Sequence, residues 1–299
     1  MNTSFNSFAR AFAAATLAIA LLPGTAQATE GILQSTGSMT LTEDHFGTIF
    51  LFQANGTLDC QNHTIYNSTQ EGICGDNFDE QCGVLVLASP DVHIVNCRVR
   101  YFGIGMHVQS SNNVMIQSSD IRENFQGIRM RWVNNNAGHF FRDNYVGFNN
   151  EEGADIDDSS GLQFLGNSQF RYNGRDGLDC GNSTVKILSG NAFRNKFNGY
   201  ELDGCNGSIL SNVLAQSNGN TGISGEVRSG ISLDATQNFV ISNSVVNSNY
   251  RDGIRVANGS NNGRIEANSG AGNGEHDAHQ TSSVGNTWIG NVFGTTAGF

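Results

Sequence analysis

Three acidic segments that share one spacing are the residues of this chain best placed to do chemistry. They read Gly153-Ala-Asp-Ile-Asp157, Gly177-Leu-Asp-Cys-Gly181 and Gly199-Tyr-Glu-Leu-Asp203, and their glycines are 24 and 22 residues apart. In each segment apolar residues or cysteine alternate with mostly acidic residues, which is the two-residue period of a strand buried on one face. The segments therefore predict carboxylates stacked on one outer face of a repeated coil.

The outward residues form two columns, two and four positions after each repeat glycine. Neighbouring strands of such a stack lie about 4.8 Å apart, so the carboxylates of one column repel each other. A ladder of this kind needs compensation by bound cations, by raised pKa values or by nearby arginines. We predict that Asp155, Asp179, Glu201 and Asp203 are catalytic, and that Arg129, Arg131, Asp157 and Asp234 bind substrate.

Two reactions on a polysaccharide suit this face. Glycosidases need two carboxyl groups, about 5–5.5 Å apart in retaining enzymes and roughly 6.5–9.5 Å apart in inverting ones. A uronate lyase or epimerase would instead bind Ca²⁺ through Asp155, Asp179 and Glu201, while an arginine neutralises the substrate carboxylate and a base removes the adjacent proton. The two arginines favour the second chemistry. A solvated, salt-bridged strand face without activity is the alternative to both.

Other charged residues give weaker indications. His107 is a candidate base, whereas His276 and His279 alone offer too few ligands to predict a metal site. An insertion at about residues 219–229 could overhang the acidic face. Pairs expected on the rim of the turns are Arg175 with Asp176 and Arg251 with Asp252.

The repeat extends over most of the chain. Glycines recur at positions 83, 103, 127, 153, 177, 199, 230 and 253, each followed one and three residues later by a residue that can lie in a core. A polar turn, two further strands and an asparagine complete each unit, and the asparagines predict hydrogen-bonded ladders. The third strands carry aromatic residues expected to stack inside the helix, namely Phe102, Phe125, Phe148, Tyr172 and Phe197. We predict an all-β, single-domain right-handed parallel β-helix with three strands per coil over residues 29–299.

Several segments resemble a known family. Leu58-Asp-Cys-Gln-Asn-His-Thr-Ile65 and Val95-Asn-Cys-Arg-Val99 resemble the opening coils, and Asn286–Gly294 the closing coil, of right-handed β-helix repeat proteins of the pectin-lyase-like superfamily. That superfamily includes carbohydrate-binding and sugar-hydrolase repeats and NosD-type periplasmic proteins. The resemblance implies the fold and a polysaccharide lyase, epimerase or hydrolase. A non-catalytic glycan-binding protein and a NosD-like periplasmic accessory protein are the alternatives, because this scaffold carries unrelated chemistries.

Residues 1–28 have the pattern of a secretory signal peptide, with Arg10, the apolar run Ala11–Leu22 and the small-x-small site Ala26-Gln27-Ala28. No apolar run is long enough to predict a membrane span. Without Arg10 the balance of charges is 15 − 27 = −12, which disfavours nucleic acid and anionic membranes as partners. We expect an exported monomer, periplasmic or extracellular, with a polysaccharide as its partner.

Six cysteines follow residue 28, and an oxidising compartment would let some of them pair. Cys74 and Cys82 flank an acidic loop and are the first expected pair. Cys180 occupies an inward strand position and is expected to be a buried thiol.

Overall fold

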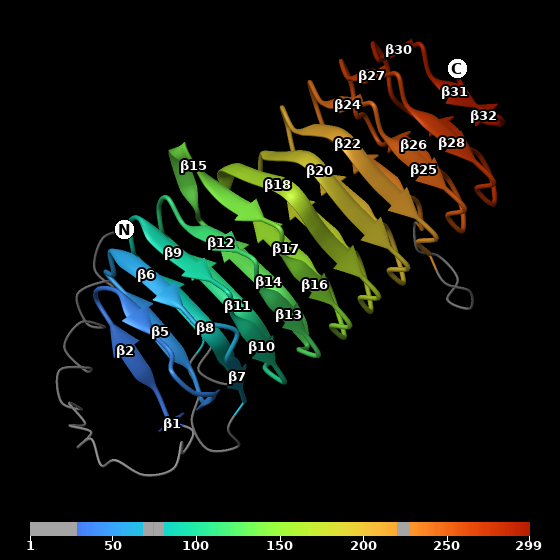
Figure 1. The fold of residues 1–299 in the computed structure, drawn as a ribbon. Helices are drawn as coiled ribbons and strands as arrows, with labels where there is room; N and C mark the ends of the chain where they lie inside the picture. Colours follow the sequence, from blue (N-terminus) through green and yellow to red (C-terminus); the bar gives the residue numbers. More distant parts are fainter. Residues whose placement is uncertain (1–28, 68–73, 75–80, 220–227) are drawn as a thin grey trace.

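A computed structural model describes residues 29–67, 74, 81–219 and 228–299, and all regular structure within these ranges is β-strand. The strands pair in parallel from coil to coil, and the chain winds from β1 (Thr29–Glu30) at one end to β32 (Thr296–Ala297) at the other, as Figure 1 shows. The predicted all-β parallel β-helix with three strands per coil is confirmed. None of the described residues forms a helix that could cross a membrane.

One sheet carries the first strand of every coil. Its strands follow one another in chain order, because each coil adds one strand to the stack. They are β2 (Leu33–Ser35), β5 (Ile49–Phe52), β8 (Cys82–Leu87), β11 (Ile104–Gln109), β14 (Gln126–Arg131), β17 (Ala154–Asp157), β19 (Leu178–Gly181), β21 (Tyr200–Asp203), β23 (Ile231–Asp234), β26 (Ile254–Ala257), β29 (Ala278–Gln280) and β32.

The second and third strands of the coils form the remaining sheet. In the middle of the stack they merge into one long strand per coil, as in β18 (Ser160–Arg171), β20 (Val185–Phe193) and β22 (Ile209–Gln216). The other members are β1, β3 (Met39–Thr40), β4 (His45–Phe46), β6 (Gly56–Asp59), β7 (Thr64–Tyr66), β9 (Val92–Val95), β10 (Arg98–Arg100), β12 (Met115–Gln117), β13 (Asp120–Arg122), β15 (Asn134–Arg142), β16 (Tyr145–Gly147), β24 (Val240–Ser242), β25 (Val245–Asn247), β27 (Arg264–Glu266), β28 (Ser269–Ala271), β30 (Thr287–Ile289) and β31 (Val292–Phe293).

The interior is a column of apolar residues, one layer per coil. Ile156, Cys180, Leu202 and Leu233 lie in register on successive strands and are fully buried. Each layer covers the next, so no coil could bury its own face alone. The inward positions predicted from the alternation are therefore confirmed in these coils.

The repeat glycine of one coil lies two residues later in the chain than predicted. The register pairs His107 with Arg129 and with Leu85, so Gly105, not Gly103, is the repeat glycine of that coil. A Cβ at Gly105 would lie 2.6 Å from the carbonyl oxygen of Gly127, and this close approach recurs from coil to coil. The interior residues of the coil are accordingly Met106 and Val108. Ile104 lies in a small separate apolar cluster with Phe50, Cys74, Cys82 and Leu85.

An asparagine ladder runs along the turn before the first sheet. The side chain of Asn149 donates to Asn173 Oδ1 at 3.0 Å, and that of Asn173 donates to Asn195 Oδ1 at 2.9 Å. The same pattern joins Asn124, Asn149, Asn173, Asn195, Asn218, Asn249 and Asn273. Each buried amide thus satisfies a backbone group and its neighbour's side chain. The predicted ladder of hydrogen-bonded asparagines is confirmed.

The aromatic residues of the third strand were predicted to fill the interior, but most of them do not. Phe125, Phe148 and Tyr172 are 52%, 46% and 37% exposed, and only Phe102 of the set is buried. Phe148 and Tyr172 have φ angles of 56° and 57°, and this left-handed backbone at the turn carries their side chains to the outside. Their rings stack on the surface with centroids 4.8 Å apart.

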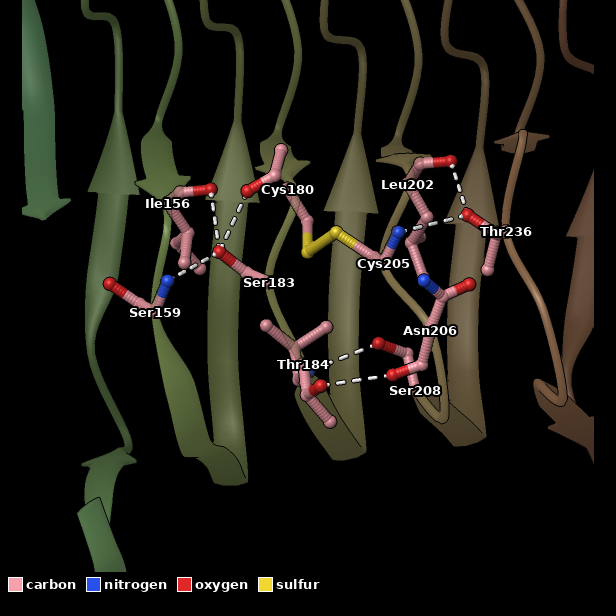
Figure 2. Close-up of a disulfide and its surroundings, with 12 residues drawn as sticks. Ile156, Ser159, Cys180, Ser183, Thr184, Leu202, Cys205, Asn206, Ser208 and Thr236 are labelled. Carbon is pink, nitrogen blue, oxygen red and sulfur yellow. Dashed lines mark hydrogen bonds between the residues drawn. A yellow bond between two sulfur atoms is a disulfide. The ribbon is translucent and has the colours of Figure 1, made fainter. Parts of the chain in front are cut away.

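The cysteines form three disulfides, Cys60–Cys97, Cys74–Cys82 and Cys180–Cys205. The expected Cys74–Cys82 pair is confirmed, whereas the prediction of a buried thiol at Cys180 is wrong. Cys205 lies one coil further along, at the turn position that Ser183 occupies in the coil before it and Thr236 in the coil after it (Figure 2). At this position the side-chain oxygen accepts a hydrogen bond from the backbone nitrogen of the preceding coil, as from Ser159 to Ser183 and from Cys205 to Thr236. From there the sulfur of Cys205 reaches the inward sulfur of Cys180, so the bond joins two neighbouring coils.

Candidate functional site

The outer face of the first sheet has the register expected from the two columns. Asp155 pairs with Arg129 on one side and with Asp179 on the other, and Asp179 pairs with Glu201. The second column runs Arg131, Asp157, Gly181, Asp203 and Asp234. The structure therefore brings these residues together in the order the sequence indicated, and their catalytic and binding roles stay predictions.

A third outward column lies beside the first and was missed. It consists of the residues immediately before the repeat glycines, which are Gln126 in the coil of the two arginines and Glu152, Asp176 and Asn198 in the three acidic coils. Their side chains contact the first column directly: Asn198 Nδ2 donates to Glu201 Oε2 at 3.0 Å. A sequence signal exists, since each of these residues is polar and precedes a repeat glycine, but the sequence analysis placed Asp176 on the turn rim and not in a column of the face.

Gln126 ties the start of the acidic ladder together. Its Nε2 donates to Glu152 Oε2 at 3.0 Å and to Asp155 Oδ2 at 2.9 Å. Its Oε1 accepts a hydrogen bond of 2.6 Å from Arg129 Nε, which also lies 3.6 Å from Asp155 Oδ2. Arg131 forms the parallel ion pair with Asp157, at 3.3 Å. Both arginines are thus engaged by the carboxylates of the next coil.

The expected pair of Asp176 and Arg175 on the rim of the turns does not form. Arg175 instead reaches Glu152, with Nη1 2.8 Å from Oε1. Asp176 is fully buried, and its Oδ1 accepts a 2.7 Å hydrogen bond from the backbone nitrogen of Asn198. Its Oδ2 has no hydrogen-bond partner among the described residues. Burial, followed by the charges of Glu201 and Asp179, raises the pKa of Asp176 well above 3.8.

Asp179 lies at the centre of the three columns. Burial raises its pKa from 3.8 to about 8, and the charges of Glu201 and Asp155 contribute in the same direction. The pKa of Asp155 is also raised, chiefly by burial, although the hydrogen bond from Gln126 opposes the shift. A carboxyl group with such a pKa holds its proton at neutral pH. A carboxyl group that holds its proton at neutral pH has the properties of a general acid.

Oxygen ligands for a cation are grouped differently from the expectation. Glu152, Asp176 and Asp179 each offer an oxygen within 4.8 Å of the others, whereas Asp155, Asp179 and Glu201 do not form such a group among the described residues. Carboxylate oxygens suit a hard cation such as Ca²⁺, and the unpartnered Asp176 Oδ2 provides one of them. These residues fit a cation in chemistry, and the role predicted for Asp155, Asp179 and Glu201 as metal ligands stays a prediction.

Two other expectations concern the surroundings of the face. His107 is 5% exposed, and burial together with Arg129 and Arg131 lowers its pKa to about 3, so it is a poor candidate for the base. The insertion expected to overhang the face falls largely on residues 220–227, which lie outside the described residues.

Solved structures with this fold include several carbohydrate-active proteins. A mutant of the periplasmic alginate epimerase AlgG is 12% identical, with a TM-score of 0.63 over 88% of this chain and 76% of its own. A DFA-IIIase from Arthrobacter chlorophenolicus A6 is 11% identical, with a TM-score of 0.61 over 79% and 63% of the two chains. The catalytic unit of a GH87 α-1,3-glucanase from Streptomyces thermodiastaticus is 8% identical, with a TM-score of 0.50 over 90% and 63%. At these identities the likeness establishes the fold alone.

Sequence comparison supplies the family. A search of curated protein sequences gave no match. The family described as "Right handed beta helix region" matches residues 132–293, which is more than half of the chain and includes the acidic coils from Asp155 to Asp234. The parallel strands and stacked coils of the structure agree with that match throughout the described residues. The chain therefore belongs to the right-handed β-helix family, with a fold of the pectin-lyase-like type.

Proposed function

We propose that this protein is an exported polysaccharide-active enzyme, and that the reaction its geometry supports best is glycoside hydrolysis. The observation that carries the proposal is the position of Asp179, a mostly buried carboxyl group in register between Asp155 and Glu201. Its pKa of about 8 keeps it protonated at neutral pH. An acid and a carboxylate on adjacent strands are the two groups that glycoside hydrolysis requires.

The roles follow from the proton on Asp179 and from the register of the strands. Asp179 donates its proton to the glycosidic oxygen as the bond to the anomeric carbon breaks, so the leaving sugar departs as an alcohol. Glu201, one strand away at about 4.8 Å along the stack, attacks the anomeric carbon and forms a glycosyl-enzyme bond, as in a retaining enzyme. Water then breaks this bond while Asp179, now deprotonated, takes the proton of the water. Asn198 holds Glu201 through Nδ2 at 3.0 Å and thereby fixes the orientation of its carboxylate.

The arginines support hydrolysis over chemistry on a uronate. A lyase or epimerase needs a cationic group to neutralise the substrate carboxylate before the neighbouring proton can leave. Arg129 is engaged by Gln126 and Asp155, and Arg131 by Asp157. Their charge is thus balanced within the protein, and the sequence argument that favoured a uronate reaction loses its main support. Asp203 and Asp234, further along the second column, remain our candidates for contacts with the sugar chain.

A uronate lyase or epimerase is the second candidate, and one observation favours it. Glu152, Asp176 and Asp179 could together hold Ca²⁺, whose charge would replace that of the engaged arginines. The neighbours with this fold include an alginate epimerase as well as the DFA-IIIase and the α-1,3-glucanase. The two candidates predict different products and a different dependence on chelators.

Export is part of the proposal. Residues 1–28 would act as the signal peptide and residues 29–299 as the mature β-helix domain. Three disulfides support this, because such bonds form and persist in oxidising compartments such as the periplasm or the extracellular space.

The test is a substrate panel of neutral glycans and polyuronates, incubated with the purified protein in Ca²⁺ or in chelator. Hydrolysis releases reducing ends from a substrate, lyase action produces ultraviolet absorbance, and epimerisation changes the sugar without cleaving it. We expect reducing ends that are unaffected by chelator and that fall at least about 1,000-fold in Asp179→Asn. Asp91→Asn is the matched control, since Asp91 is an exposed aspartate whose carboxylate accepts a hydrogen bond from Asn113.

Each other result has a definite meaning. Unsaturated or epimerised uronate that disappears in chelator would establish the second candidate and refute hydrolysis. Full activity in both Asp179→Asn and Glu201→Gln would show that the acidic face is not the active site. Binding of a glycan without turnover would make the protein a non-catalytic glycan-binding module, whose exposed Phe148–Tyr172 stack could then contact sugar rings.

A further inference from the structure

A second group of ligating side chains lies near the C-terminal end of the same sheet. Asp252 precedes a repeat glycine, and one coil later His276 occupies the same column while His279 occupies the neighbouring one. Nδ1 of His276 lies 3.2 Å from Asp252 Oδ1, and Nδ1 of His279 lies 3.3 Å from Asp252 Oδ2. The two rings have centroids 5.0 Å apart, so both histidines face one carboxylate.

Asp252 is the buried member of this group. Its side chain is fully buried, whereas His276 and His279 are 33% and 23% exposed, so the group opens to solvent only on the histidine side. The nearby Arg251 is engaged by Glu275 through hydrogen bonds of 2.8 and 2.9 Å, and its charge is already offset. Arg255 lies in register with His279, but within the described residues no ion pair joins it to Asp252. Carboxylates as deeply buried as this one are commonly paired with a cation or bound to a metal.

The distances are long enough for a cation to be shared between Asp252 and the two histidines. Charge-assisted hydrogen bonds between nitrogen and a carboxylate are usually about 2.7–2.9 Å long. Ligand atoms bound to one tetrahedral metal through bonds of about 2.0–2.1 Å are roughly 3.3–3.4 Å apart. The values of 3.2 and 3.3 Å between Asp252 and the two histidines fall close to the second range.

The segment that carries the histidines is fixed on both sides. Glu275 is tied to Arg251 of the previous coil, as described above. Asp277, between the histidines, accepts hydrogen bonds through Oδ2 from the backbone nitrogens of Gly294 at 2.9 Å and Thr295 at 3.0 Å. Its Oδ1 accepts one from Asn273 Nδ2 at 2.6 Å. The two imidazoles are therefore held in place before any ion binds, which lowers the entropy cost of binding.

We propose that Asp252, His276 and His279 form a binding site for a divalent transition-metal cation, with Zn²⁺ as the first choice. Two imidazoles and a carboxylate are ligands that Zn²⁺ and its first-row neighbours accept, whereas Ca²⁺ prefers oxygen ligands alone. Three protein ligands leave the exposed side of the ion open to water or to another ligand. The site lies three to four strands from Asp179, roughly 14–19 Å along the stack, and is separate from that carboxyl group.

The experiment uses the purified protein without a polyhistidine tag, stripped with a chelator that is then removed. Zn²⁺ is titrated in competition with a chromophoric chelator, and Co²⁺ is added separately to record the visible absorption of the bound ion. The variants are His276→Gln, His279→Gln and the double variant. The matched control is His93→Gln, because His93 is an exposed histidine on β9. Thermal unfolding and circular dichroism of each variant establish that the coils remain folded.

We expect one Zn²⁺ per chain in the wild type and in His93→Gln, an affinity at least about 10-fold lower in each single variant, and no site in the double variant. A readout that needs no variant is the protection of His276 and His279 from diethylpyrocarbonate by Zn²⁺, mapped by mass spectrometry. Equal binding by the wild type and a folded double variant would overturn the proposal. So would equal modification of both histidines with and without Zn²⁺.

Discussion

Replacing Asp179 by Asn should change how the stability of the protein depends on pH. The folded protein keeps a proton on Asp179 up to about pH 8, whereas the unfolded chain releases it near the ordinary pKa of 3.8. Between these values the folded state binds more protons than the unfolded state, so the free energy of unfolding falls as pH rises. The contribution is complete below about pH 4 and is lost by the time pH has passed through about 8.

The magnitude follows from the two pKa values. A difference between 3.8 and about 8 corresponds to roughly 5–6 kcal/mol if Asp179 alone responds. Asp179 is coupled to Glu201 and Asp155, which can take up a proton in its place, so we expect about 2–3 kcal/mol to be observed. Asn has the same shape and no charge, and the variant should therefore lose much of this pH dependence. It should be more stable than the wild type above about pH 8, by about 2–3 kcal/mol, while losing activity.

The assay is urea unfolding of the wild type, Asp179→Asn and the control Asp91→Asn at several values from about pH 4 to about pH 9, followed by circular dichroism. The midpoint of the wild type and of the control should fall toward high pH by a similar amount, and that of Asp179→Asn should fall much less. Parallel curves for Asp179→Asn and the wild type over the whole range would refute the reasoning. In that case Asp179 would be an ordinary ionised carboxylate, and the proposal that it acts as a general acid would be refuted as well.

Two further predictions concern the scaffold. Asn173→Ala should lower the free energy of unfolding by about 2–4 kcal/mol in urea titrations, because it removes the acceptor of the backbone and side-chain nitrogens of Asn149 and one donor to Asn195 Oδ1. A loss below about 0.5 kcal/mol would show that the ladder contributes little. Replacing Cys180 and Cys205 together by Ala should lower the free energy of unfolding by about 3 kcal/mol, as expected for a disulfide that closes a 25-residue loop. Thermal unfolding with and without reductant measures this, and an unchanged midpoint in the variant would contradict it.

Much of the fold could be predicted because the same pattern of glycine and alternating inward residues recurs in successive coils. Every coil must bury one apolar face against its neighbours, so the alternation after Gly153, Gly177 and Gly199 indicates both strand and register. Where a coil departed from the repeat, prediction failed. Gly103 was mistaken for Gly105, because two glycines two residues apart satisfy the same pattern and only the hydrogen-bonded register tells them apart.

Residues at the turns were the least predictable. Phe148 and Tyr172 resemble core residues by type, yet their left-handed backbone carries them outward. Cys180 looked like an isolated thiol, because its partner Cys205 belongs to a turn of the next coil and not to the same strand column. Backbone conformation at a turn depends on its neighbours in the stack, and a single chain segment does not reveal it.

The sequence by itself determined the β-helix and the order of charges along its first sheet, since both follow from spacing. Only the tertiary structure decided which of those charges interact. Glu152 and Asp176 join the site because, in these coils, the residue before the repeat glycine faces the same side of the sheet as the residue two positions after that glycine. The structure likewise engages both arginines and brings Asp252 between two histidines. Burial and distance set the protonation of a carboxyl group, and neither exists before the coils are stacked.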